Sequence, residues 1–464
     1  MKNKYRTEHD SLGEVQVPVD VLWGAQTQRS LYFFAVGSDR FSAEFINAFA
    51  LVKKAAALAN HELGKLPQGK KDLIVTACDE ILQGQHREQF PLSVWQTGSG
   101  TQTNMNLNEV IANRGGELAG CERGLYTELH PNDHVNMSQS SNDVFPTAMH
   151  VVTAQQLPLL IRALAGLRSA LQHKVEEYEH VLKSGRTHMM DATPMTLGQE
   201  FSAFKAQLDY SHQQIEVSMP AICQLAIGGS AVGTGMNTHP RWAQTVTRFI
   251  GDLSGIPFAT ADNLFMALAA HEALLDLHGR LSVLASSLFK IANDIRLMNS
   301  GPRCGLAELR VPANEPGSSI MPGKVNPTQA EAMTMICTRV LGNQTTMLMA
   351  GSQGHFQLNV FKPLIIHTLL ESMTLLTGAM NSFNQHCISG LQANLQQLAS
   401  NVSRSLMLVT ALSPVIGYEK AAHAARHADL YNLGLREAVV QLQLMTGEAF
   451  DAAVRPSDMI APNA

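Results

Sequence analysis

An apolar residue recurs at every third or fourth position between Leu274 and Met298. The positions are Leu274, Leu277, Leu281, Leu284, Leu288, Ile291, Ile295 and Met298. This alternation of three and four places them on one face of a helix, and a stripe of this length packs against neighbouring helices in a left-handed bundle. No proline interrupts the segment between Pro257 and Pro302. We therefore predict a long, buried helix here.

Four further apolar runs have the length of bundle helices, at roughly 147–180, 195–222, 328–350 and 364–385. Alternating strand patterns are scarce, and few β-hairpin signals occur. The pattern predicts a fold dominated by α-helices. We expect three domains: a mixed, mainly helical N-terminal domain (1–139), a central bundle of long helices (140–396) and a small helical C-terminal domain (397–464).

Length and composition narrow the class of protein. A chain of 464 residues is too long for one compact core. The formal net charge of -5 argues against a nucleic-acid-binding protein. The polar start, with no apolar run of about 18 residues anywhere, predicts no membrane span and a cytoplasmic location. Six cysteines without a CxxC pair predict buried free thiols rather than a zinc site.

Two polar segments precede apolar runs. "WQTGSGTQTNMNLNEV" (Trp95 to Val110) has a Gly-Ser-Gly-Thr turn whose hydroxyls and free N–H groups suit a carboxylate or phosphate, although a plain helix N-cap would look similar. "HPNDHVNMSQSSNDVFPTAMH" (His130 to His150) holds six consecutive polar side chains before its apolar run. A helix cap needs one, so the surplus favours a ligand site.

A third segment, "SGRTHMMDATPMTLGQE", sets His188 between Arg186, Thr187 and Asp191. Histidine is the side chain best suited to exchange protons near neutral pH. The Thr193-Pro194 pair that follows predicts a helix start.

The fourth segment, "EPGSSIMPGKVNP" (Glu315 to Pro327), surrounds Lys324 with serines, glycines and prolines. Five residues separate its first glycine from the Gly-Lys pair, which excludes a P-loop. We predict Asn326 and Pro327 as N-cap and first residue of the helix that carries Glu331, so that the helix start and Lys324 attract an anion together. The prolines and glycines suggest a mobile lid.

The four segments share hydroxyls, amides, one lysine and one histidine. They contain no metal-ligand cluster, no dinucleotide fingerprint and no nucleophile elbow. This inventory favours a small polycarboxylate substrate and proton transfer without a metal or cofactor.

The motif "GSSIMPGKVNP" resembles the signature loop of the fumarase/aspartase superfamily. The resemblance runs from "WGAQTQRS" (Trp23 to Ser30) to "VRPSDMI" (Val454 to Ile460). Within the superfamily the chain is most similar to class II fumarases, also called fumarase C. "GRTHMMDATP" has His188 where aspartases carry glutamine, and "MPGKVNPTQAEA" has Gly323 and the Thr328-to-Glu331 run of fumarases.

The resemblance implies a lyase that adds water reversibly and stereospecifically to fumarate, giving (S)-malate in the citric acid cycle through an aci-carboxylate carbanion. It also implies a five-helix bundle that forms a twenty-helix core in a homotetramer, with each active site shared by three subunits. Two alternatives remain open: addition of ammonia to fumarate, and a non-enzymatic role like that of superfamily members recruited as lens proteins.

Residue roles follow from the same resemblance. Ser318 would abstract the proton, and His188 would act on the water side, paired with Glu331. The residues expected to bind substrate are Ser99, Gly100, Thr101, Ser140, Ser141, Asn142, Thr187, Ser319, Lys324, Val325 and Asn326. His130, Pro131, Asn132 and Asp133 match a second anion site, but the arginine usual there is missing from "LYTELHPND".

Overall fold

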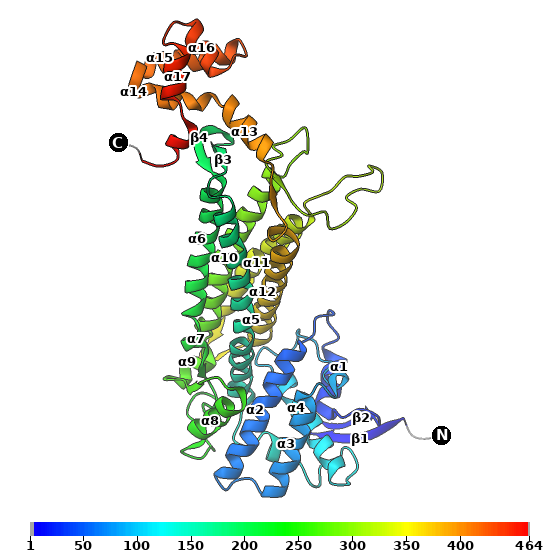
Figure 1. The fold of residues 1–464 in the computed structure, drawn as a ribbon. Coiled ribbons are helices and arrows are strands. Elements are labelled where there is room, and N and C mark those ends of the chain that lie inside the picture. The colour runs from blue at the N-terminus through cyan, green and yellow to red at the C-terminus, as the bar shows by residue number, and fades with distance from the viewer. Residues whose placement is uncertain (1–3, 463–464) are drawn as a thin grey trace. The chain divides into compact units, whose positions relative to one another are not determined.

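The computed structural model describes residues 4–462, in which helices predominate, as the sequence predicts (Figure 1). The helices are α1 (Ala25–Phe33), α2 (Ala43–Glu62), α3 (Gln68–Leu82), α4 (Thr101–Leu118), α5 (Ser141–Glu177), α6 (Leu197–Glu216), α7 (Met219–Ile222), α8 (Trp242–Ser254), α9 (Leu264–Ala269), α10 (Glu272–Met298), α11 (Thr328–Gly351), α12 (Lys362–Phe383), α13 (Leu395–Arg404), α14 (Ser413–Ile416), α15 (Tyr418–Leu430), α16 (Leu435–Gln441) and α17 (Gly447–Ala453). Short 3-10 or π turns are η1 (Arg87–Gln89), η2 (Pro131–Val135), η3 (Asn384–Ile388), η4 (Leu406–Leu412) and η5 (Pro456–Met459).

Strands occur only as two-stranded pairs in the described chain, in keeping with the scarcity of alternating patterns. The pairs are β1 (Tyr5–Asp10) with β2 (Gly13–Pro18), β3 (Leu182–Thr187) with β4 (Met190–Thr196), β5 (Gln224–Leu225) with β6 (Ala259–Thr260), β7 (Leu309–Arg310) with β10 (Gln392–Ala393), and β8 (Gly354–His355) with β9 (Leu358–Asn359). The β5–β6 pair is parallel and the others are antiparallel.

The chain divides into two compact units, each assembled from three separate stretches. Unit 1 comprises the stretches 1–161, 213–283 and 339–375. Unit 2 comprises 162–212, 284–338 and 376–464. The two units are described separately below.

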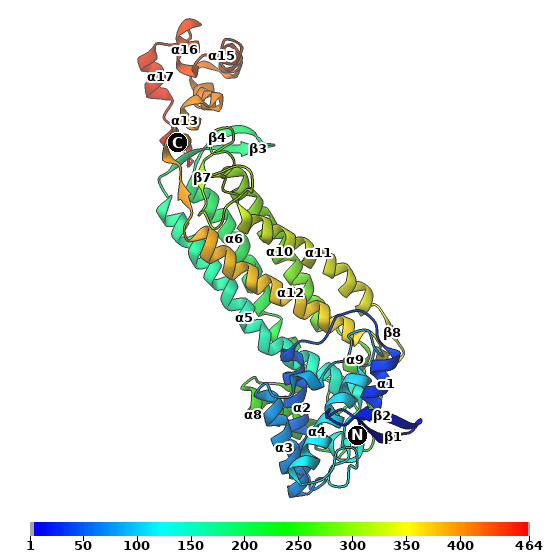
Figure 2. The same ribbon diagram turned by 90° about the vertical axis from the view of Figure 1, so that its right-hand side faces the viewer.

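Unit 1 has an aromatic cluster beside helices α2, α3 and α4, which lie side by side in both views (Figures 1 and 2). Phe45 and Phe49 of α2 pack against Phe145 of α5, with ring centroids 5.2 and 5.8 Å apart from the Phe145 ring. All three rings are fully buried. The cluster therefore fixes the start of α5 against α2, and the first turn of α5 carries predicted site residues.

Unit 2 contains a small helical core near the C-terminus, where α15, α16 and α17 gather in both views (Figures 1 and 2). Its buried residues are Leu408, Leu412, Ala424, Leu435, Val439, Phe450 and Val454. The β3–β4 hairpin also belongs to this unit and packs against α13. The turn of that hairpin carries His188.

The predicted apolar stripe is confirmed. It lies on α10, where all of its positions from Leu274 to Met298 are at most 4% exposed. Two helices, α5 and the segment Lys362–Ile388, are long and apolar enough to cross a bilayer, but 67% and 61% of their most apolar windows are buried inside the protein. This burial is what core helices of a bundle require.

Two local expectations differ from the structure. The Thr193-Pro194 pair does not start a helix: Pro194 lies in β4, and α6 begins at Leu197 after Thr196 accepts the N–H of Gln199 at 3.0 Å. Four cysteines are buried free thiols as expected, whereas Cys304 is exposed.

Candidate active site

The first predicted segment forms the N-terminus of α4. Gly100, with φ 77°, precedes the helix, and Ser99 Oγ lies 2.9 Å from Thr101 Oγ1. A Cβ on Gly100 would overlap the Phe145 ring of α5. Glycine is therefore required both for the left-handed conformation and for the close approach of the two helix starts.

The second predicted segment forms the N-terminus of α5. Ser140 donates its backbone N–H to Asp143 Oδ1 at 2.9 Å, and its Oγ accepts the backbone N–H of Asn142 at 3.2 Å. Ser141 Oγ accepts a hydrogen bond from Asn104 Nδ2 on α4 at 3.0 Å. This bond joins the two helix starts directly.

The two helix starts together make a site suited to a carboxylate. Each helix N-terminus carries a partial positive charge and free N–H groups. Ser99, Thr101, Ser140, Ser141 and Asn142 add hydroxyl and amide groups, and none of these side chains is fully exposed. The structure thus brings the first and second predicted segments together within unit 1.

A buried lysine lies beneath these helix starts. Lys53 is 0% exposed, and its Nζ donates to Asn136 Oδ1 at 3.1 Å and to Gln139 Oε1 at 2.9 Å. Asn136 Oδ1 also accepts a hydrogen bond from Asn104 Nδ2 at 3.1 Å, so Lys53 connects through two side chains to Ser141. Burial lowers the pKa of Lys53 to about 7.

Asp143 is a buried carboxylate that interacts electrostatically with Lys53. Burial raises its pKa to about 6, against the opposing effects of backbone N–H donors and of Lys53. Its Oδ2 accepts the backbone N–H groups of Gly228 and Ser230 at 3.1 and 2.9 Å. Neither Lys53 nor Asp143 was singled out from the sequence. The signal for Lys53 was a lysine within the apolar run "FALVKKAAALAN".

The third predicted segment forms the β3–β4 hairpin of unit 2. Thr187 pairs with Met190, and the two residues between them, His188 and Met189, have φ values of 55° and 64°. Two consecutive positive φ values define a tight hairpin turn, here made without glycine. His188 is exposed and makes no hydrogen bond or ion pair with any residue between 4 and 462.

A buried ion-pair cluster supports this hairpin. Arg186 donates to both carboxylate oxygens of Glu308, at 3.0 and 2.7 Å, and Glu308 is 0% exposed. Lys183 Nζ lies 2.6 Å from Glu200 Oε2 and 3.8 Å from Glu308 Oε2. Burial raises the pKa of Glu308, but Arg186, Lys183 and Asn401 together lower it more, so that the pKa is held below its usual value.

The fourth predicted segment is a loop closed at its neck. Gly317 donates its N–H to Lys324 O at 2.8 Å, and Asn326 Nδ2 donates to Gly317 O at 2.6 Å. A Cβ on Gly317 would lie 2.5 Å from Lys324 O. Because the crossing bonds need this close approach, Gly317 cannot be replaced without opening the neck.

Ser318 lies just inside the neck. Its Oγ accepts the backbone N–H groups of Ile320 and Met321 at 3.2 and 3.0 Å. Ser319, Lys324 and Val325 are exposed. The loop thus presents an exposed ammonium group close in sequence to a serine oxygen that already receives two N–H donors.

The expected cap of the following helix is wrong. Helix α11 begins at Thr328, and the Asn326 side chain closes the loop neck instead of capping the helix. Glu331 lies in the first turn of α11 and is exposed. Within residues 4–462 the structure records no hydrogen bond or ion pair between Glu331 and His188. Arg186 of the hairpin pairs instead with Glu308, which lies just before β7.

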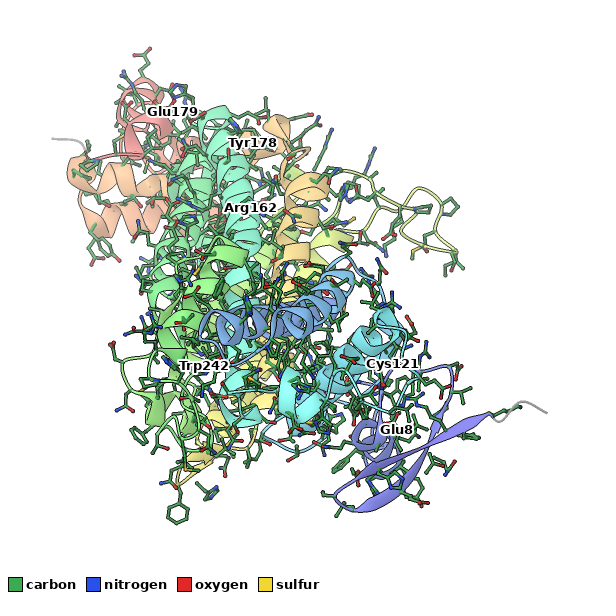
Figure 3. The ribbon with its side chains drawn as sticks, turned by 90° about the horizontal axis from the view of Figure 1, so that it is seen from below. Glu8, Cys121, Arg162, Tyr178, Glu179 and Trp242 are labelled. Carbon is green, nitrogen blue, oxygen red and sulfur yellow. The ribbon has the colours of Figure 1, made fainter. Side chains whose placement is uncertain are left out.

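The second predicted anion site has an acidic lining. His130 to Asp133 lead into η2, and His130 Nδ1 lies 3.4 Å from Asp133 Oδ2. The adjoining cavity of about 430 Å³ is lined also by Glu8, Asp10 and Glu109, and Glu8 is labelled on β1 in Figure 3. Burial raises the pKa of Glu109 to about 7. Glu8 and Asp10 are paired with Arg6 and Arg29, each at 2.7 Å, so these two arginines are already engaged by carboxylates.

Comparisons with known proteins cover nearly the whole chain. Residues 13–342 match the family model described as Lyase, and residues 408–461 match the one described as Fumarase C C-terminus. A relative from Pseudomonas putida named Fumarate hydratase class II is 56% identical over 458 residues, which is 98% of this chain and 99% of that protein. A relative of the same name from Chromobacterium violaceum is 54% identical over 461 residues, with 99% and 100% covered.

A solved structure agrees with these relatives. The recombinant class II fumarase of Schistosoma mansoni is 44% identical and has a TM-score of 0.96, with 99% of this chain and 100% of that chain covered. The matched lyase model spans more than half of the chain, and several relatives share more than half of its residues. The chain therefore belongs to the lyase family, as one of the class II fumarate hydratases.

Proposed function

We propose that the protein is a fumarate hydratase, which adds water reversibly to fumarate to give (S)-malate in the cytoplasm. The observation that carries this proposal is the junction of two helix N-termini in unit 1, where the Asn104–Ser141 hydrogen bond joins hydroxyl-bearing helix starts. This junction suits a carboxylate, and it occurs in a chain 56% identical to a protein named Fumarate hydratase class II.

Two carboxylates must be bound for this reaction. In our proposal Ser99, Thr101, Ser140, Ser141 and Asn142 bind one of them at the helix starts. Lys324 and Asn326 bind the other, together with Thr187 and Ser319. When malate loses the proton next to a carboxylate, charge spreads into that carboxylate, and a fixed cation stabilises the resulting dianion. The exposed Lys324 ammonium supports this assignment.

Ser318 is proposed as the group that takes the proton from malate. A serine hydroxyl is a poor base unless its alkoxide is stabilised. The two backbone N–H groups of Ile320 and Met321 already point at Ser318 Oγ, and such donors stabilise negative charge on an oxygen. In the hydration direction the same group returns a proton to carbon.

His188 is proposed to handle the hydroxyl side. In hydration it accepts a proton from water as the oxygen bonds to carbon, so the carbon–carbon double bond is replaced by one C–H and one C–O bond. A hairpin turn with His188 exposed at its tip is consistent with a group presented to a substrate. Glu331 would stabilise the charged imidazole in the assembled enzyme.

The residues proposed for one site lie in both units, and we propose that three subunits of a homotetramer contribute to each site. Helix α11 supports association: Met335, Leu348 and Met349 are 68%, 55% and 61% exposed. Exposed apolar side chains on a long helix favour burial against a partner surface. The division into three domains (1–139, 140–396 and 397–464) remains a prediction.

The decisive assay follows the ultraviolet absorbance of the fumarate double bond. Malate should generate this absorbance, fumarate should lose it, and aspartate should give no signal. The His188→Asn variant should lose activity, whereas His180→Asn, at a side chain 91% exposed, should keep it. Fumarate released from aspartate but not from malate would refute the proposal and favour the ammonia-adding alternative. Activity should persist in the presence of a chelator.

A further inference from the structure

Unit 1 contains a cavity of about 470 Å³ that the proposed reaction does not use. It is bounded by α5, α7, β5, α9 and the start of α10, and its lining includes His150, Gln224, Ala226, Met266, Ala270 and His271. A cavity of this size, with mostly apolar walls and a few polar groups, has the character of a small-molecule site.

Two side chains of the lining have buried polar atoms without partners. His271 is 3% exposed, and neither Nδ1 nor Nε2 has a hydrogen-bond partner among residues 4–462. Gln224 Oε1 is likewise buried and unpaired within the described chain. Buried polar atoms are normally hydrogen-bonded, so three such atoms around one cavity indicate that something else pairs with them.

These groups offer lone pairs. His150 Nδ1 lies 2.8 Å from the carbonyl oxygen of Ile222, so it carries the hydrogen, and Nε2 of the neutral ring is an acceptor. Burial lowers the pKa of both His150 and His271, which keeps the rings uncharged. A neutral His271 has one acceptor nitrogen and one N–H donor, and Gln224 Oε1 accepts only, so acceptors outnumber donors among the unpaired atoms of the lining. A ligand that complements the acceptors of this cavity must therefore carry N–H or O–H donors.

The charges around the cavity favour a cation over an anion. Asp262 and Glu272 belong to the lining and are exposed, while Asp276 is neutralised by Arg280 at 2.7 Å. Among residues 4–462, no lysine or arginine is part of the lining. Lys362 interacts electrostatically with His271 and donates to the carbonyl groups of Leu268 and Asn359, and burial lowers its pKa to about 7.

We propose that this cavity binds a small organic ammonium ion with an apolar body. The ammonium group donates hydrogen bonds to the acceptors of Gln224, His150 and His271, and the carboxylates of Asp262 and Glu272 offset its charge. The apolar body lies against alanines such as Ala226 and Ala270. The proposal concerns a second site and does not depend on the proposed reaction.

The test uses benzylamine, with benzyl alcohol and benzoate as probes of matched shape, and the full chain in isothermal titration calorimetry. Benzylamine should bind and raise the midpoint of thermal unfolding, benzyl alcohol should bind more weakly, and benzoate should bind at least tenfold more weakly. Absence of benzylamine binding would overturn the proposal, and so would benzoate binding of equal strength.

Variants locate the binding. Gln224→Met and His271→Phe keep the approximate shape and remove acceptors, so each should weaken benzylamine binding at least tenfold. Gln213→Met, at an exposed position on α6, should bind as the unchanged protein does. If His271→Phe does not fold, the affinity of Gln224→Met for benzylamine alone decides whether the amine binds in this cavity. Unchanged affinity in the Gln224→Met variant would place the amine elsewhere and overturn the proposal.

Discussion

The buried Nζ of Lys53 donates a hydrogen bond to Oδ1 of Asn136 at 3.1 Å, and the same Oδ1 accepts a second hydrogen bond from Nδ2 of Asn104. Asn104 in turn holds Ser141 at the start of α5. A fully buried lysine side chain is thus part of the hydrogen-bond network that supports a proposed carboxylate site. Each hydrogen bond of this network contributes about 0.5–1.5 kcal/mol, so together they hold these side chains in position.

The first prediction concerns the pH dependence contributed by Lys53. Its pKa is about 7 in the folded chain, whereas the ordinary pKa of a lysine, 10.5, applies to the unfolded chain. Between pH 7 and pH 10.5 the unfolded chain therefore binds more protons than the folded chain. The free energy of unfolding should therefore rise with pH above about pH 7, by at most ~1.4 kcal/mol per pH unit. Below pH 7 Lys53 is protonated in both states, so the full destabilisation from burying its charge is present. Lys53→Met should remove this rise.

Urea unfolding of both proteins at several values between about pH 7 and pH 9 measures the difference. Lys54→Met is the matched control, because Lys54 lies next in sequence but pairs with Asp79 at the surface. Parallel stability curves for Lys53→Met and the unchanged protein would show that the ammonium is not the group responsible.

Gly98 should tolerate no side chain. A Cβ there would overlap the carbonyl oxygen of Val360, which is backbone and cannot rotate away. We expect Gly98→Ala to lower the free energy of unfolding by about 1–3 kcal/mol, as overpacking does, and to raise KM because Ser99 follows directly. Gly69→Ala, at a helix position with nothing within 4 Å, should be neutral or slightly stabilising. Equal stability of the two variants would contradict this expectation.

Lys324→Met should impair both binding and turnover. The lysine would hold a carboxylate in the ground state and the developing dianion in the transition state, so KM should rise and kcat should fall together. A lost charge-assisted hydrogen bond corresponds to a decrease in kcat/KM of roughly 10- to 150-fold at least. Lys420→Met, at an exposed position, serves as control. Near-normal kinetics of Lys324→Met would exclude the lysine from the site.

Arg186→Met should leave Glu308 buried with Lys183 as its remaining cation, 3.8 Å away. Breaking a buried pair costs about 3–5 kcal/mol, and we expect the lower value because Lys183 remains. The pKa of Glu308 is lowered, so its pair contributes fully above the ordinary pKa of 4.5 and is lost as pH falls through the folded value. Thermal unfolding near neutral pH measures the loss of stability in Arg186→Met. The double variant Arg186→Met/Glu308→Leu should recover part of that loss, because it removes the unpaired carboxylate. A loss below about 1 kcal/mol would show that the pair is dispensable.

Mixed subunits provide a test of shared sites. If one site takes His188 and Ser318 from different chains, His188→Asn and Ser318→Ala subunits refolded together should form some sites with neither change. Activity should therefore appear in the mixture although each variant alone is inactive. No recovery from verified mixed oligomers would mean that each chain completes its own site.

The sequence predicted elements whose cause is local, and missed those whose cause is tertiary. The stripe on α10 was visible because helical periodicity alone determines which side chains are buried. The Thr193-Pro194 pair suggested a helix start but lies in β4, because strand pairing in the β3–β4 hairpin outweighs the local signal. The neck bond from Asn326 to Gly317 competes with helix capping, and only the folded loop decides between the two. Lys53 was missed because its partners lie more than 80 residues away.

The assembly of each unit from three stretches of the chain has a consequence for recombination between related genes. No contiguous fragment of the gene encodes either unit, because the stretches alternate along the chain from Arg162 to Leu375. A recombination event between two related genes in this interval would mix parental segments in both units at once. Such hybrids keep their cores only when the parents are already compatible. A crossover outside this interval would instead mix segments in one unit only.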